Sequence, residues 1–285
     1  METFKADQPK GLNWKAIVAC LSFFIFSSNF AHATQWSETE KLLEHIGVYD
    51  SFDNFDQIFI QGVQQSSKKP GTDPALIELF SQAAKNHLNS ENLITIYKKK
   101  LKSKLTPEII QAASTWYYSD LGSRVNLAEE KINDPKIQEE MMAMAGELMA
   151  NQERVALVSK IISSLNMSEM MITMQNQVAI TLFENMATAK GNADPQQIEA
   201  IKQQIINNSA ASKAQLDQFI TLALLYAHKD FEVDELKKYE AFTTSDNGVA
   251  FNLAMIEAFT STLSNAMSAL SIELQSSLKA IAKID

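Results

Sequence analysis

A stretch of eighteen residues occurs twice in this chain, 126 positions apart. The first copy runs from Leu105 to Gly122, and the second runs from Phe231 to Gly248. Each copy begins with an apolar residue, continues with acidic residues and ends in Ser-Asp-x-Gly. Because apolar residues recur at helical spacing between these ends, each copy is predicted to form a helix, a tight corner and the start of another helix.

Capping residues mark the ends of these predicted helices. Thr106 followed by Pro107 is typical of an N-cap and a first-turn proline. The Ser-Asp pair is expected to cap the following helix, and the glycine is expected to end the first helix with a positive φ angle. The aromatic residue of each copy is predicted to pack in the core. The motif positions predicted to be structural are Thr106, Trp116, Ser119, Asp120, Gly122, Asp234, Phe242, Ser245, Asp246 and Gly248.

The similarity extends beyond this motif. Lys41-Leu-Leu-Glu-His-Ile-Gly-Val matches a segment that begins at Lys160, and Asp73-Pro74 matches Asp194-Pro195. The order of the matches is kept and their offset changes little, as loop insertions would produce. Several segments in register indicate an internal repeat. We therefore predict two tandem helical bundles, residues 34–157 and 158–285, with five or six helices each.

Composition favours an all-α fold. The chain has 285 residues with only 8 glycines and 6 prolines, and no run of alternating β-branched residues predicts a sheet. The net charge of -9 argues against a nucleic-acid partner, since phosphate binding needs a basic surface.

The first 33 residues have the pattern of a secretory signal peptide. Three lysines precede an apolar run, and Ala31-His-Ala33 fits a cleavage site after Ala33. We expect a periplasmic or secreted protein that contacts the membrane only through this signal. An uncleaved signal, which would anchor the protein in the inner membrane, is the alternative. Cys20 is the only cysteine, so a mature chain would contain neither disulfides nor thiolate metal sites.

These motifs resemble an exported bacterial family, domain of unknown function 2059, present here as two tandem copies. The resemblance lies in the signal sequence, in the helix that begins at Lys41, and in the two copies of the threonine- or acidic-start motif that end at Gly122 and Gly248. It implies an exported helical protein and no known activity.

The sequence contains no local catalytic or metal-binding motif. His45, His87 and His228 have no second histidine at helical spacing, and no phosphate-binding or nucleophile motif is present. We therefore predict no cofactor, no metal and no catalytic residue. The favoured function is a binding or scaffold protein with an unknown protein, peptide or lipid partner. An envelope hydrolase whose carboxylate or histidine site is assembled from distant residues is the alternative.

Methionine is unusually concentrated. Nine of the 12 methionines lie between Met141 and Met186, and four of them share one helix face: Met167, Met170, Met171 and Met174. Three interpretations compete. The stripe is flexible core filler where the repeats meet, or an adaptable apolar surface for a partner, or a thioether site for copper(I).

Overall fold

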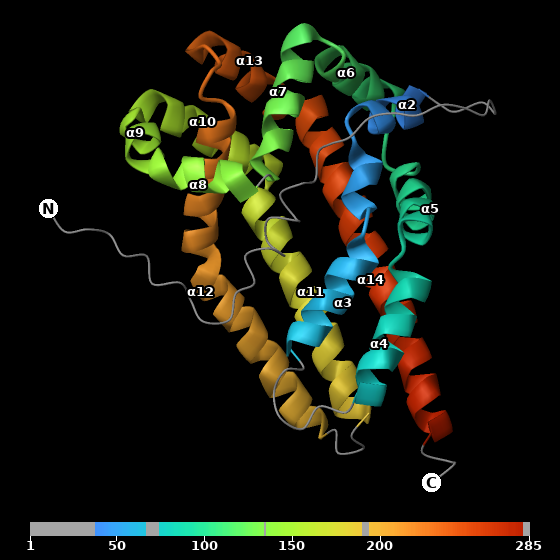
Figure 1. Ribbon diagram of the computed structural model, residues 1–285. Helices are drawn as coiled ribbons and strands as arrows, with labels where there is room; N and C mark the ends of the chain where they lie inside the picture. The colour runs from blue at the N-terminus through green and yellow to red at the C-terminus, as the bar shows by residue number, and fades with distance from the viewer. Residues whose placement is uncertain (1–37, 67–73, 134, 190–193, 282–285) are drawn as a thin grey trace, which may run out of the picture.

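The computed structural model describes residues 38–66, 74–133, 135–189 and 194–281. Within these residues the fold is all-α, as predicted, and contains no strand. The predicted signal peptide, including Ala31 and Ala33, lies outside the described residues, and so does Asp73. Figure 1 shows that α11, α12 and α14 run along the length of the molecule, whereas α2, α6, α7, α10 and α13 gather towards one end.

The first half of the described chain, residues 38–150, consists of short helices. They are α2 (Glu38–His45), the 3-10 helix η1 (Val48–Phe52), α3 (Phe55–Ser66), α4 (Pro74–His87), α5 (Ser90–Leu101), α6 (Pro107–Tyr117), α7 (Asp120–Glu130), the 3-10 helix η2 (Lys131–Asn133), α8 (Pro135–Ala143) and α9 (Ala145–Ala150). The second half, residues 151–281, consists of five helices, three of which are the longest in the described chain: α11, α12 and α14. The five helices are α10 (Gln152–Leu165), α11 (Met167–Ala189), α12 (Pro195–Ala227), α13 (Val233–Thr243) and α14 (Asp246–Ile281).

The prediction of five or six helices per half holds for the second half and is wrong for the described first half. Where the second half has the single helix α12, the first half is interrupted between α4 and α5. Asn89 starts α5 there by accepting the backbone N–H of Asn92 at 3.0 Å. Where the second half has the continuous helix α14, Pro135 starts α8 after η2, because a proline cannot continue a preceding helix. The corresponding position in α14 is Ser261, which allows the helix to continue.

The predicted boundary between residues 157 and 158 falls inside α10, which is one continuous helix. A junction at Asn151, between α9 and α10, fits the helices instead. The helices α2 and α10 also end alike, because Gly47 and Asn166 both have left-handed φ angles, of 69° and 50°. These two residues are 119 positions apart, which is the offset of the match between Lys41 and Lys160.

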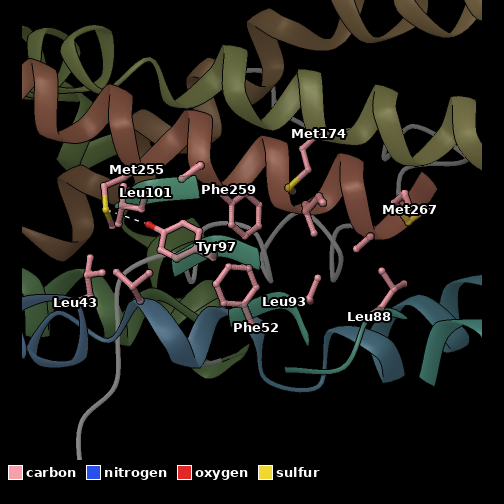
Figure 2. Close-up of a cluster of buried hydrophobic side chains, with 14 of the residues drawn as sticks. Leu43, Phe52, Leu88, Leu93, Tyr97, Leu101, Met174, Met255, Phe259 and Met267 are labelled. Atoms are coloured by element: carbon pink, nitrogen blue, oxygen red, sulfur yellow. Dashed lines mark hydrogen bonds between the residues drawn. The ribbon is translucent and has the colours of Figure 1, made fainter. Parts of the chain in front are cut away.

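The buried apolar residues of the described chain form two hydrophobic cores, and neither belongs to one half alone. The first core is built from α2 to α6 together with α14 and Met174 of α11. Figure 2 shows Met255, Phe259 and Met267 of α14 lying among side chains of the first half, including Tyr97. The second core is built from α10, α12, α13 and the start of α11, together with residues of α7, η2 and α8. Each core therefore draws helices from both halves, so the limits of the cores do not coincide with those of the two predicted repeats.

No single described helix has the length and apolar composition needed to cross a membrane. Only α10 followed by Met167–Thr181 passes this test as a bent pair, with a bend of 47°. The buried residues of α10 belong to the second core, and helices from the core of a globular protein pass the same test.

Candidate functional site at the junction of the two halves

The corners of the two motif copies have the same hydrogen bonds. In the first corner, the Ser119 hydroxyl accepts the backbone N–H of Gly122 at 3.0 Å and donates to the carbonyl oxygen of Trp116 at 2.6 Å. In the second corner, Ser245 makes the two matching bonds at 3.1 Å and 2.7 Å. The predicted capping role of the two serines is therefore confirmed, and both corners reverse the chain in the same way.

The role predicted for the two glycines is wrong in its physical reason. Gly122 and Gly248 lie in the first turn of α7 and α14, and the one described glycine with a positive φ angle is Gly47. A Cβ atom added at Gly122 would overlap the carbonyl oxygen of Trp116, and one at Gly248 would overlap that of Phe242. Glycine is needed because the new helix begins against the end of the preceding one.

Other motif residues act at the helix starts, as predicted. The Thr106 hydroxyl accepts the N–H of Ile109 at 3.4 Å and caps α6. Asp120 accepts a hydrogen bond from Arg124 at 3.0 Å within α7. Asp234 and Asp246 lie in the first turns of α13 and α14, where a negative charge stabilises the helix by interacting favourably with its dipole.

The two motif copies meet in a stack of aromatic rings. Trp116 stacks against two rings of α13, with centroids 5.0 Å from Phe242 and 5.5 Å from Tyr239 and nearly parallel planes. Tyr117 contacts Phe242 edge-on at 5.7 Å and reaches Phe251 of α14 at 5.9 Å. Aromatic pairs of this kind stabilise a contact by about 0.5–1.5 kcal/mol beyond their buried area. Trp116 and Phe242 are therefore packing residues, and they pack against each other.

A buried polar cluster lies beside this stack. His228 is fully buried, with Nε2 3.0 Å from Oε1 of Glu129 in α7, and its Nδ1 has no hydrogen-bond partner among the described residues. Burial and the charge of Glu129 raise the pKa of the Tyr239 hydroxyl, which is also hydrogen-bonded to this carboxylate. Arg154 of α10 donates to the carbonyl oxygens of Phe231, at 2.8 Å, and of His228. The cluster joins α7, α10, α12 and α13, and the imidazole of His228 has no exposed surface. It is therefore a structural contact.

The other two histidines of the described residues, His45 and His87, also make structural contacts. His45 Nε2 lies 3.1 Å from the carbonyl oxygen of Tyr117, and its ring lies against that of Tyr118. His87 Nε2 lies 2.7 Å from Oε2 of Glu273 in α14. Each histidine thus has a partner on a different helix, and these contacts bring no two histidines together. The hydrolase alternative required convergent groups in a cleft, and these histidine contacts do not form one.

The methionine stripe lies at the boundary between the cores. Met171 is 1% exposed and belongs to the second core, whereas Met174 is 6% exposed and belongs to the first. Met167 and Met170 are half-buried. The interpretation of the stripe as a surface for a partner is therefore wrong for Met171 and Met174, because neither side chain is accessible. The core-filler interpretation fits this placement, since a flexible unbranched side chain adapts to the irregular space between two cores.

One shallow surface hollow lies next to the second corner. Its volume is about 500 Å³, and it is lined by Ser159, Lys160, Ser163, Ser164 and Thr244. Lys160, one of these lining residues, makes an ion pair with Glu240 at 3.4 Å. No carboxylate or imidazole lines the hollow, so it does not supply the acid–base pair that hydrolysis needs.

The similarity between the two motif copies continues past their glycines. After Gly122 and Gly248, both copies continue with three residues and Asn-Leu. The asparagines, Asn126 and Asn252, are buried. The leucines that follow them, Leu127 and Leu253, are 51% and 40% exposed. The repeated Asn-Leu pair is the sequence signal that marks these positions.

Within the described parts of the chain, no group of three or more His, Cys, Asp or Glu residues could hold a metal ion. Comparison with protein-family models, with curated proteins and with solved structures finds no match to the chain. The resemblance to domain of unknown function 2059 therefore stays a prediction.

Proposed function

We propose that the protein is a non-catalytic binding or scaffold protein, exported to the bacterial envelope and composed of two copies of one helical unit. Matching features support the duplication. The helices α6 and α13 have 11 residues each, and their corners share the same hydrogen bonds and the same need for glycine. The signal-peptide pattern of residues 1–33 supports export.

The contacts of the histidines support a non-catalytic role. A general base must lie within hydrogen-bond reach of its substrate. His228 is enclosed by Glu129, Tyr239 and Phe231 and has no exposed surface. His45 and His87 are each held by a partner far away in the sequence.

The exposure of Leu127 and Leu253 is the observation that carries the binding role. A single exposed leucine is ordinary in a folded protein. Here the same motif position is apolar and exposed in both halves, although each leucine directly follows a buried asparagine. A residue kept apolar at two matching surface positions indicates contact with a partner. The partner is a protein, peptide or lipid that meets an apolar surface.

Photo-cross-linking in the envelope tests this role. A photoreactive amino acid is placed at Leu127, at Leu253, or at Ile206 as a control. Ile206 is 40% exposed but lies in α12, outside the motif. We expect the same adduct from both leucine positions and not from the control, and the mass of the adduct shows whether it is a protein, a peptide or a lipid. The absence of a shared adduct, or the same adduct from Ile206, would remove the basis of the proposal.

A further inference from the structure

Trp116 and Phe242 hold the same position in the two motif copies, and they also contact each other. Their ring centroids are 5.0 Å apart and their planes differ by 10°. In a two-fold symmetric assembly, a residue meets its own counterpart only where the symmetry axis passes. The stack therefore marks an approximate two-fold axis that relates α6 to α13.

The helical segment that follows each corner packs in the core of the opposite half. Val125 of α7 belongs to the second core, whereas Phe251, its counterpart in α14, belongs to the first. Farther along, Met141 of α8 belongs to the second core and Leu263 of α14 belongs to the first. The exchange is reciprocal: α14 packs on α4, α5 and α6 of the first half as well as on α11 of its own half, while α7, α8 and α9 pack on α12.

Polar contacts follow the same exchange. Glu129 in α7 and Met255 in α14 hold matching positions in the two halves. Glu129 Oε1 lies 3.0 Å from His228 of the second half. Met255 Sδ accepts a hydrogen bond from the Tyr97 hydroxyl of the first half at 3.0 Å, the dashed line in Figure 2. Each acceptor is thus held by the half that its helix covers.

From these contacts we propose that the chain is a two-fold dimer fused into one polypeptide, in which each half closes the core of the other with its last helical segment. This inference rests on the duplication that is part of the proposed function. The face of α4, α5 and α6 is the interaction surface for α14, and a face of α12 is the matching surface for α7, α8 and α9. A single unit of this kind, without a second unit fused to it, is expected to associate with another copy of itself.

Hydrogen exchange of the full chain, measured by mass spectrometry, tests the exchange of helices. The variant Leu263→Ala opens a cavity under α14, and Met141→Ala opens one under α8; both side chains are buried. We expect Leu263→Ala to accelerate exchange in α4 and α5 by more than about tenfold, with a smaller effect in α10 and α13. Met141→Ala is expected to give the opposite pattern.

The test depends on which helices exchange faster in each variant, and not on how much stability each variant loses. If Leu263→Ala acts mainly on α10 and α13, α14 belongs to its own half and the inference is wrong. If both variants affect all helices equally, or affect none, the cores are not closed reciprocally and the inference is also wrong. If Leu263→Ala does not fold, Leu263→Val leaves a smaller cavity and is expected to give the same pattern with a smaller amplitude. Cross-linking at Leu127 and Leu253 reports on the surface, so failure of one proposal is distinguishable from failure of the other.

Discussion

Substitution of Gly122 or Gly248 by alanine tests the geometry of the corners. In most helices this change stabilises the fold by about 0.5–1 kcal/mol, because alanine has less backbone freedom to lose on folding. At these two positions the new methyl group would overlap a backbone carbonyl oxygen of the preceding helix. A backbone atom cannot move aside as the end of a side chain does. Forced packing of this kind costs about 1–3 kcal/mol, so we expect a net loss of about 1–2 kcal/mol in the free energy of unfolding.

Two other helical glycines supply matched controls. A Cβ atom added at Gly62 in α3 or at Gly146 in α9 meets nothing within 4 Å, so alanine is expected to leave the stability unchanged or raise it by up to about 1 kcal/mol. Urea unfolding followed by far-ultraviolet circular dichroism measures all four variants under the same conditions. If Gly122→Ala and Gly248→Ala are as stable as the two controls, the close approach at the corners does not exist and the reasoning fails.

Three further predictions concern the aromatic stack, a carboxyl group and the signal peptide. Trp116→Ala removes both stacking contacts of this half-buried ring and is expected to lower the free energy of unfolding by about 2–4 kcal/mol, measured by urea unfolding. Burial, with the charges of Asp53 and Glu44, raises the pKa of Asp50 from 3.8 to about 6. The folded state therefore binds this proton more tightly than the unfolded state, so the contribution of Asp50 to stability falls as the pH rises from about 4 to 6. Asp50→Asn should raise stability at neutral pH and change it little near pH 4; an equal effect at both pH values would contradict the assigned cause. Ala33→Leu is expected to block removal of the signal, since a small residue is needed at the cleavage site, and the intact mass of the exported protein checks this.

The sequence was sufficient to predict those features of the fold that depend on local signals. Helical spacing, few glycines and the absence of strand patterns predicted the all-α class. The capping roles of Thr106 and Ser119 are predictable because a side-chain oxygen three residues before a free backbone N–H is a local arrangement. Pro135 is likewise a local signal for the start of a helix, and it divides the first half where α14 is continuous.

The features that depend on contacts between distant residues could not be predicted in this way. The pairing of Glu129 with His228 and that of Tyr97 with Met255 join residues 99 and 158 positions apart. No local pattern indicates which core receives α14, since an apolar helix face fits either one. The methionine stripe shows the same difficulty: its spacing identified one helix face, but not that Met171 and Met174 would be divided between two cores.

The hydrogen bond between Tyr97 and Met255 has a consequence for the order of folding. The first half cannot complete its core until α14 has been synthesised, because Phe251 to Leu274 of α14 complete the core around Tyr97. Contacts between residues so far apart slow folding, since a long loop must close before they form. A chain that crosses a membrane before it folds would benefit from such a delay, because its N-terminal half cannot complete its fold before the chain has crossed.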